Sequence, residues 1–335
     1  MSVRDVLIIG AGPSGLSAAI AAKQRGLDYQ VVEQGTLVNS IFHFPPQMVF
    51  FTTPELLEIG GLPFISPFEK PTRPEALKYY RKVVDTFDLQ IVYEEKVLAV
   101  TAEPEEAAGG TLFGVETRSS RGVRRVRLAR HVIFAIGYYD HPNLLNVPGE
   151  NLPHVHHYYS ESHPYYRQRV VIVGGGNSAA EAALELFRSG VHVTMVHRAP
   201  ELKSTIKYWV RPDIENRIKE ASIAARFNSC VKEIRPTTIL INTRAESGET
   251  TEEVPADTVF LLTGYRADSQ LMTSAGIQLN DREAPVCDPV TFETNVPGLF
   301  VAGGAIAGVD TGTIFIENGR FHGEKVIEAI AARCG

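Results

Sequence analysis

The stretch RDVLIIGAGPSGLSAAIAAKQRGLDYQVVE, residues 4–33, decides the fold of this chain. It contains a continuous apolar strand, a glycine turn Gly10-x-Gly12-x-x-Gly15, a helix that ends near Gly26, and a second apolar strand. In such a turn the first glycine allows the tight change of direction. The second lets a pyrophosphate approach the backbone, and the third lets the helix pack on the strand. Phosphates then lie against free N–H groups at the positive end of the helix dipole, so the stretch predicts a dinucleotide-binding strand–helix–strand unit.

The same pattern occurs again in RVVIVGGGNSAAEAALELFRSGVHVTMVHR, residues 169–198. Its turn is Gly174-x-Gly176-x-x-Ala179, with alanine as the third small residue. One such turn alone is weak evidence, whereas two complete units in one chain indicate an internal duplication. Continuous apolar strands are typical of parallel sheets that are covered on both faces. The sequence therefore predicts an α/β fold with two nested Rossmann-like dinucleotide-binding domains.

The residues that close the two units differ in charge. Glu33 ends the first unit, where a carboxylate can accept hydrogen bonds from both ribose hydroxyls of an adenine nucleotide. The second unit ends at His197 and Arg198 instead, and a guanidinium is suited to bind a phosphate. We therefore expect FAD at the first unit and NADPH, through its 2′-phosphate, at the second. The alternative for Arg198 is a solvated charge at the end of a strand.

The duplication extends beyond the glycine turns. Two short apolar strands end in glycine, HVIFAIG at 131–137 and TVFLLTG at 258–264. The segment TNVPGLFVAGG at 294–304 and a helix starting near Thr313 have no nucleotide motif of their own, so they are expected to return to the first domain. The predicted domains are a discontinuous FAD-binding domain of residues 1–150 and 285–335 and an inserted NADPH-binding domain of residues 151–284.

The composition excludes several classes of protein. The 335 residues are 44% hydrophobic and 21% charged, as in soluble globular proteins, and the net charge of −6 argues against a nucleic-acid partner. The arginine-rich run 121–130 alternates with apolar residues and predicts a strand with one solvated face. There is no leader pattern and no apolar run of the roughly 18 residues that a membrane helix needs. We expect a cytoplasmic protein without a membrane partner.

The cysteines and histidines do not form a recognisable site. Cys230, Cys287 and Cys334 are widely spaced, which fits neither a disulfide framework nor a zinc or CxxC motif. The histidine-rich stretch 154–163 contains Glu161 but no further ligand at metal spacing. Aromatic packing is the favoured interpretation of this stretch, and no metal is predicted.

Several longer stretches carry a family resemblance. They are VNSIFHFPPQMVFFTTPELLEIG (38–60), HYYSESHPYY (157–166), GGGNSAAEAALEL (174–186), STIKYW (204–209) and IFIENGRFHG (314–323). With the paired glycine motifs, they resemble the bacillithiol disulfide reductases within the low-molecular-weight thioredoxin-reductase branch of two-dinucleotide-binding flavoproteins. The resemblance covers almost the whole chain and implies a thioredoxin-reductase-like fold.

The chain departs from these families at three places. Thioredoxin reductases have a CxxC in the inserted domain, but AsnSerAlaAlaGlu follows Gly176 here, which argues against direct thioredoxin reduction. Bacillithiol disulfide reductases commonly have cysteine in the first glycine loop, where this chain has Ser14, and a serine cannot form a mixed disulfide. Gly304 stands where thioredoxin reductases offer an aspartate to the flavin, so backbone groups of Gly303 and Gly304, with Asp310 as a substitute, are expected to serve.

Motifs and resemblance together define the predicted sites. The residues predicted to bind FAD are Gly10, Gly12, Pro13, Ser14, Gly15, Glu33, Gln34, Ser40, Val97, Gly137, Gly303, Gly304 and Ile314. Those predicted to bind NADPH are Gly174, Gly176, Asn177, Ser178, Ala179, His197, Arg198, Gly264 and Tyr265.

Two of these positions have further predicted roles. The resemblance makes Ser14 the catalytic candidate, while the alternatives for its hydroxyl are pyrophosphate binding and simple packing. The start of the last helix, at Thr313 and Ile314, is expected to face the flavin N1–C2=O region, where a helix dipole stabilises negative charge.

The function implied by the resemblance is hydride transfer from NADPH to FAD and onward to a low-molecular-weight disulfide, bacillithiol disulfide. One alternative is electron delivery like that of ferredoxin/flavodoxin–NADP reductases, and another is a non-enzymatic redox sensor that responds to nucleotide occupancy. A flavin monooxygenase is less favoured because an FxGxxxHxxxY-like stretch is absent. A homodimer or higher homo-oligomer is expected by analogy alone.

Overall fold

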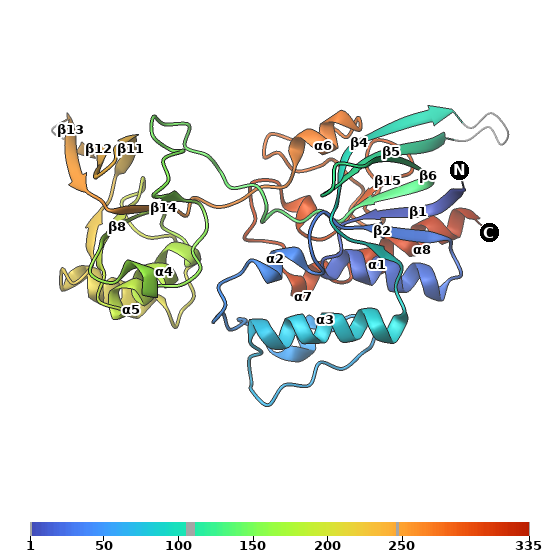
Figure 1. Ribbon diagram of the computed structural model, residues 1–335, viewed down its shortest axis with the longest axis horizontal. Coiled ribbons are helices and arrows are strands. Elements are labelled where there is room, and N and C mark those ends of the chain that lie inside the picture. Colours follow the sequence, from blue (N-terminus) through green and yellow to red (C-terminus); the bar gives the residue numbers. More distant parts are fainter. Residues whose placement is uncertain (1, 105–110, 246–247, 335) are drawn as a thin grey trace. The chain divides into compact units, whose positions relative to one another are not determined.

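The computed structural model describes residues 2–104, 111–245 and 248–334, and the chain divides into two compact units (Figure 1). The first unit comprises residues 1–141 and 265–335, and the second comprises residues 142–264.

The unit boundaries differ from the expected ones at both ends of the insertion. The expected FAD-binding domain comprised residues 1–150 and 285–335, and the expected NADPH-binding domain comprised residues 151–284. Residues 142–150 instead fall in the second unit, where Val147 packs against a hydrophobic core. Residues 265–284 fall in the first unit, because they contain helix α6 (Ser269–Ser274) and bury Met272 in the core of that unit.

The first unit is built on a sheet of order β3-β2-β1-β6-β5-β4, with β15 also paired to β6. Its strands are β1 (Val3–Ile9), β2 (Tyr29–Val32), β3 (Ile91–Val92), β4 (Glu95–Pro104), β5 (Thr111–Ser119), β6 (Arg124–Phe134) and β15 (Leu299–Val301). The carboxyl half of β6 lies parallel to β1 and β15, while its amino half pairs antiparallel with β5. The arginine-rich run thus contributes to a strand, as predicted, and this strand joins the parallel and antiparallel parts of the sheet.

Helices α1 (Pro13–Gln24), α3 (Arg73–Phe87) and α8 (His322–Cys334) lie together on one side of β1 and β2 (Figure 1). Helix α3 begins with a capping box, since the Glu75 N–H donates to the Thr72 hydroxyl (3.4 Å) and the Glu75 carboxylate accepts from the Thr72 N–H (2.8 Å). Short helical turns complete the unit: α2 (Asn39–Phe42), η1 (Pro54–Leu57), η3 (Gly303–Ala307) and α7 (Ile316–Gly319).

The last helix does not start at Thr313 as expected. Asn318 accepts a hydrogen bond from the Phe315 N–H (2.8 Å) and donates to the Thr313 carbonyl (2.9 Å), which holds this segment in a loop. The chain forms only the short α7 and then enters α8. The prediction of a helix N-terminus at Thr313 and Ile314 was therefore wrong.

The second unit repeats the parallel arrangement with the order β10-β9-β8-β14-β7. The strands are β7 (Val155–His156), β8 (Arg169–Val173), β9 (His192–Val196), β10 (Ala224–Arg226) and β14 (Thr258–Leu261). Helices α4 (Asn177–Arg188) and α5 (Arg211–Lys219) lie near one another, and a separate antiparallel sheet consists of β11 (Ser229–Ile234), β12 (Thr238–Ala245) and β13 (Gly248–Pro255) (Figure 1). The 3-10 turn η2 (His163–Tyr165) lies in the histidine-rich stretch, where Tyr165 packs edge-on against Phe260, so aromatic packing is observed there.

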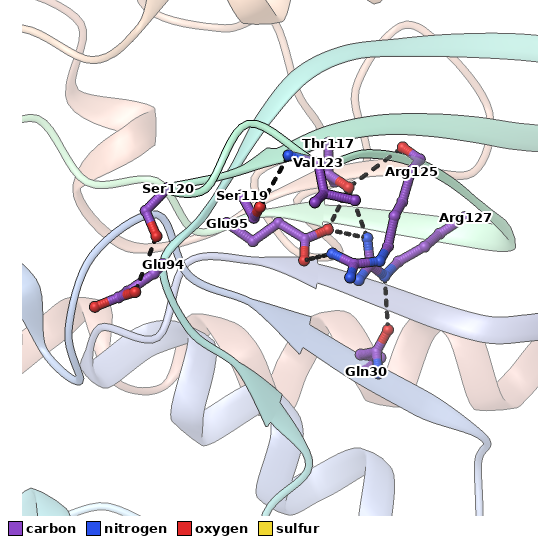
Figure 2. Close-up of polar contacts among 9 residues, drawn as sticks. All are labelled: Gln30, Glu94, Glu95, Thr117, Ser119, Ser120, Val123, Arg125 and Arg127. Atoms are coloured by element: carbon purple, nitrogen blue, oxygen red, sulfur yellow. Dashed lines mark hydrogen bonds and ion pairs between the residues drawn. The ribbon is translucent and has the colours of Figure 1, made fainter.

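A buried carboxylate ties the strands of the first sheet together (Figure 2). Glu95, at the start of β4, is 2% exposed and accepts hydrogen bonds from Arg127, Thr117 and Arg125, the last at 3.1 Å. Arg127 also donates to Gln30 of β2 at 2.9 Å. Burial raises the pKa of Glu95, but the hydrogen bonds of Arg127 and Thr117 and the two positive charges outweigh it, so the pKa is lowered. The network therefore links β2, β4, β5 and β6.

We expect Arg127→Met to destabilise the first unit by about 3 kcal/mol, because it removes one partner of a buried ion pair. Urea unfolding at pH 7 measures this loss. The lowered pKa of Glu95 means that its stabilisation is complete above the unfolded-state pKa of about 4.3 and is lost as the pH falls through the folded-state value. The difference between variant and wild type should therefore shrink below about pH 4.

Arg124→Met is the matched control, since Arg124 pairs with Glu116 at the surface and is 66% exposed. This control should change stability by less than about 1 kcal/mol. Equal losses in the two variants would contradict a stabilising role for the buried network.

Candidate functional site

The first glycine loop connects β1 to α1 and leaves one side open. Gly10 has a φ of +106°, and a Cβ there would collide with the Ala135 carbonyl oxygen. A Cβ on Gly15 would collide with the Gly10 carbonyl oxygen, so helix and strand need glycine at both places. A Cβ on Gly12, in contrast, would meet nothing within 4 Å. The open side at Gly12 fits a pyrophosphate, whose place a larger side chain would occupy.

Glu33 lies directly after β2 and holds this loop. It is 5% exposed, and its carboxylate accepts hydrogen bonds from the Ala11 N–H (2.7 Å) and the Gly35 N–H (2.8 Å). Burial raises the pKa of Glu33, and these N–H groups partly offset that rise. Because each carboxylate oxygen has two lone pairs, acceptor positions remain for ribose hydroxyls.

Ser14 lies in the first turn of α1, and its hydroxyl has a partner within the protein. Ser14 Oγ donates to the Gly319 carbonyl oxygen at 2.9 Å, and a Cβ on Gly303 would lie 2.8 Å from Ser14 Cβ. A Cβ on Gly319 would lie 3.3 Å from Ile314 Cγ2. The structure thus brings Ser14, Gly303 and Ile314 together around Gly319, and the hydroxyl proton is engaged in joining α1 to the end of α7.

The glycines after β15 have close neighbours. The Gly303 N–H donates to His322 Nδ1 at 3.2 Å. Burial, with Lys325 nearby, lowers the pKa of His322 to about 4, so the ring is neutral and able to accept. Gly304 packs against the ring of Tyr138, and Asp310 forms an exposed ion pair with Arg282 at 2.7 Å. Within the described residues, the Gly303 N–H and the Asp310 carboxylate are therefore engaged by partners in the protein.

Other predicted FAD residues lie around the same edge of the sheet. Gln34 donates to Asp140 at 2.8 Å, and a Cβ on Gly137 would lie 4.0 Å from Ser40 Oγ. Val97 is buried in β4 at a break in the pairing with β5. Gln34 also lines a hollow of about 380 Å³, together with Lys96 and Arg118 among others. The sequence patterns did not point to Lys96 or Arg118, whose register pairing across β4 and β5 depends on long-range strand alignment.

The second loop repeats the first with a different third residue. A Cβ on Gly174 would collide with the Leu262 carbonyl oxygen and lie 3.1 Å from Ala179 Cβ. A Cβ on Gly176 would meet only Lys203 Cδ, at 3.8 Å. Asn177 donates to the Thr205 carbonyl (3.1 Å) and accepts from the Lys207 N–H (3.0 Å), so the segment after β9 is held against this loop. Ser178 is the second residue of α4.

Positive charge gathers at the second loop. Arg198 and Lys203 are both exposed, and neither forms an ion pair with any residue in the described part of the chain. The Lys203 N–H donates to the Gly175 carbonyl at 2.9 Å, which places this lysine beside the loop. Lys203 was not predicted, since it follows the strand by several residues and only the fold returns it to the glycines.

His197 is buried against the second loop. It is 7% exposed, and a Cβ on Gly175 would lie 2.5 Å from its ring. Its Nε2 has no hydrogen-bond partner among the described residues. Burial, followed by the charges of Lys203 and Arg198, lowers the pKa of His197, so the imidazole is neutral and retains an unused polar atom.

The last two predicted NADPH residues fall in different units. Gly264 ends the second unit, and its carbonyl accepts from the Asn143 N–H at 2.9 Å. Tyr265 belongs to the first unit, where its ring lies 4.6 Å from that of Tyr139. The assignment of Tyr265 to NADPH therefore stays a prediction.

Known proteins share this architecture. The family model described as pyridine nucleotide-disulphide oxidoreductase matches residues 7–303. Bacilliredoxin reductase Bdr of Bacillus subtilis (strain 168) is 41% identical over 335 residues, which cover 99% of each chain. Bacillithiol disulfide reductase Bdr (YpdA) from Bacillus cereus has a TM-score of 0.93 at 39% identity, covering 99% of this chain and 100% of that chain. Thioredoxin reductase of T. acidophilum shows the same fold at a TM-score of 0.74 and 22% identity, covering 100% of this chain and 99% of that chain.

Two glycine loops that each follow a strand with parallel neighbours, one beside a carboxylate and one beside two cations with no ion pair among the described residues, are typical of flavoprotein oxidoreductases with two dinucleotide-binding domains. The chain belongs to the pyridine nucleotide-disulphide oxidoreductase family. It is an NADPH-dependent enzyme, its cofactors are FAD and NADPH, and the predicted thioredoxin-reductase-like fold is confirmed.

Neither a membrane-spanning helix nor a metal-binding cluster occurs among the described residues. No helix there is long and apolar enough to cross a membrane. No group of three or more His, Cys, Asp or Glu side chains in that part of the chain is arranged to hold a metal ion.

We expect Gly12→Val to abolish FAD retention, because the new side chain would fill the open side of the first loop. The absorbance ratio of flavin to protein after purification measures retention, and circular dichroism checks that the variant is folded. Gly176→Val, in the second loop, is the control and should retain FAD. A control at Gly26 is avoided because Gly26 has a φ of +70°, which strains any other residue. A fully yellow Gly12→Val protein would contradict the assignment of FAD to this loop.

We expect Arg198→Ala to weaken NADPH binding by about 10- to 150-fold and to leave NADH binding nearly unchanged, since a charge-assisted contact contributes about 1.5–3 kcal/mol. Stopped-flow reduction of the flavin by each coenzyme measures the two affinities. Arg211→Ala is the control, because Arg211 already pairs with Glu215 on α5. An equal loss for both coenzymes would refute the phosphate contact.

Proposed function

We propose that this enzyme reduces a low-molecular-weight disulfide, bacillithiol disulfide, with NADPH as the electron donor. The observation that carries the proposal is the similarity along the whole chain to bacilliredoxin reductase and bacillithiol disulfide reductase, at 41% and 39% identity. The balanced reaction is NADPH + H⁺ + RSSR → NADP⁺ + 2 RSH. FAD supplies the two-electron relay between the nicotinamide hydride and the disulfide.

In this proposal the first glycine loop holds FAD. The Gly12 side of the loop receives the pyrophosphate, and Glu33 accepts hydrogen bonds from the ribose. Gln34 and Lys96, which line the hollow, are the chain neighbours of Glu33 and Val97. The hollow is therefore suited to the adenine end of the nucleotide. The carboxylate of Glu33 would repel a 2′-phosphate, so the same residue disfavours NADPH at this loop.

The second glycine loop holds NADPH. Arg198 and Lys203, which have no ion-pair partner in the described part of the chain, supply two cations for the 2′-phosphate, and Gly176 leaves room for the pyrophosphate. The neutral imidazole of His197 offers Nε2 to the nucleotide without adding a charge.

The route to the disulfide does not depend on a reactive thiol among the described side chains. Ser14 replaces the loop cysteine and its hydroxyl is bonded to Gly319. Burial, with Asp288 nearby, raises the pKa of Cys287, which disfavours the thiolate that disulfide exchange requires. Cys230 is exposed on β11, outside both glycine loops. The disulfide is therefore reduced without a mixed disulfide at Ser14, Cys230 or Cys287.

A second candidate function is electron transfer to ferredoxin or flavodoxin. Ferredoxin–NADP reductase of Ignicoccus hospitalis is 28% identical over 306 residues, which cover 90% of each chain. The missing CxxC is compatible with this function. Identity to that reductase is lower than to the disulfide reductases, so disulfide reduction is the favoured proposal.

We expect the purified flavoprotein to consume NADPH anaerobically when bacillithiol disulfide is added, and to release two thiols for each NADPH. The triple variant Cys230→Ala, Cys287→Ala, Cys334→Ala should keep this turnover, because the proposed route uses no protein thiol. Ser14→Cys should raise it by adding a thiolate route. Flavin reduction that stalls with the disulfide but continues with ferredoxin would support the second candidate instead, and loss of turnover in the triple variant would exclude the thiol-free route.

A further inference from the structure

Tyr138 and Gly304 form a close pair beside the first glycine loop. A Cβ on Gly304 would lie 2.7 Å from Tyr138 Cδ1, 2.9 Å from Tyr138 Cε1 and 3.5 Å from Gly137 Cα. Gly304 is not among the glycines with a positive φ, so its backbone is compatible with any residue. The tyrosine ring, rather than the backbone conformation, is therefore what requires glycine at this position.

The segment that carries Tyr138 is held by the two residues that follow it. Asp140 accepts hydrogen bonds from Gln34 (2.8 Å) and Asn39 (3.5 Å), which belong to the segment that follows Glu33. The Tyr139 ring packs edge-on against Phe44, with ring centroids 5.0 Å apart. Because Tyr139 and Asp140 are anchored to residues 34–44, the backbone that carries Tyr138 is held in place beside Gly304.

Tyr138 lies where a bound dinucleotide would pass. It follows Gly137 beyond the carboxyl end of β6, and β6 lies between β1, which leads into the glycine loop, and β15, which leads into Gly303 and Gly304. Ligands of open parallel sheets bind beyond the carboxyl ends of such strands. Tyr138 is partly exposed, so packing on Gly304 does not bury the whole residue.

The phenol is neutral in this environment. Burial and the nearby carboxylate of Glu317 raise the pKa of Tyr138. An apolar ring with a neutral hydroxyl can cover a flavin nucleotide without adding charge beside its phosphates.

We propose that Tyr138 is a positioning residue for FAD: its ring, braced against the backbone of Gly304, contacts the bound cofactor, and glycine at 304 is required in order to seat the ring. The inference rests on the proposed placement of FAD at the first glycine loop. The Tyr138 ring occupies the space that a side chain at residue 304 would otherwise fill.

The test compares Tyr138→Ala, Tyr138→Phe, Gly304→Ala and the double variant Tyr138→Ala/Gly304→Ala. For each protein, FAD affinity is measured by titrating the apoprotein, together with the thermal midpoint of the apoprotein and the visible spectrum of the bound flavin. We expect Tyr138→Ala and Gly304→Ala each to weaken FAD binding by about tenfold, and Tyr138→Phe to stay within about threefold of wild type, because it keeps the ring. Tyr166→Ala, at a 58% exposed tyrosine of the second unit, is the control and should change none of these values.

The double variant decides whether the pair is coupled. With the ring removed, an alanine at 304 has room, so the double variant should bind FAD no more weakly than Tyr138→Ala alone. Tyr138→Ala should also shift the flavin absorption band, while Tyr138→Phe should leave it in place. Losses that multiply in the double variant would overturn the proposal, as would a lower apoprotein midpoint in Tyr138→Ala with unchanged FAD affinity and spectrum.

Gly12→Val separates this inference from the proposed function. If Gly12→Val keeps FAD, the placement of the cofactor at the first loop fails, whatever the Tyr138 variants do. If Gly12→Val loses FAD while every Tyr138 and Gly304 variant binds it as wild type does, only the role of Tyr138 fails.

Discussion

The close approach of backbone to backbone at the carboxyl ends of parallel strands is the constraint on which both sites depend. At Gly10 the chain passes against the Ala135 carbonyl, and at Gly174 it passes against the Leu262 carbonyl in the same way. Neither contact leaves room for a side chain. The helix that follows can therefore start immediately after the strand, and its N–H groups are presented where phosphates bind. The same steric arrangement therefore occurs twice in this chain, once at each glycine loop.

What distinguishes the two sites is the charge that borders each loop. In the first unit the Glu33 carboxylate is bonded to the Ala11 and Gly35 N–H groups, so a negative charge is built into the support of the loop. In the second unit the corresponding place is taken by a neutral His197, with Arg198 and Lys203 beside it. A negative border accepts ribose hydroxyls and repels an extra phosphate, whereas a positive border binds it. The difference in charge between the two borders is the physical basis for the proposal that FAD binds at the first loop and NADPH at the second.

Local sequence patterns predicted those features of the fold and of the candidate sites that depend on residues close together in the chain. The strand–helix–strand units at 4–33 and 169–198, and the chemistry of Glu33 and Arg198, follow from contiguous stretches. The location of residues 265–284 depends instead on burial of Met272 in a core made by distant strands. These long-range contacts leave no mark on local periodicity.

The sequence patterns also did not predict contacts made by single side chains. The start of α7 is displaced from the predicted Thr313 by two hydrogen bonds of Asn318. The positions of Lys203 and Tyr138 beside their glycines depend on where the fold returns the chain. No spacing rule in the sequence specifies such contacts, because they depend on the three-dimensional fold.

The hydrogen bond of Ser14 has a consequence for how specificity arises. It joins the first turn of α1 to Gly319 at the end of α7, two segments far apart in the chain. A thiol in this place would be a weaker donor to the Gly319 carbonyl, so serine favours a firmly held loop and gives up a nucleophile. In the proposed reaction residue 14 forms no covalent bond to the acceptor, so non-covalent contacts alone would orient it. Arg320 follows Gly319 and donates hydrogen bonds to the carbonyls of Glu55 and Glu58, so the segment that is bonded to Ser14 is itself tied to the stretch 38–60.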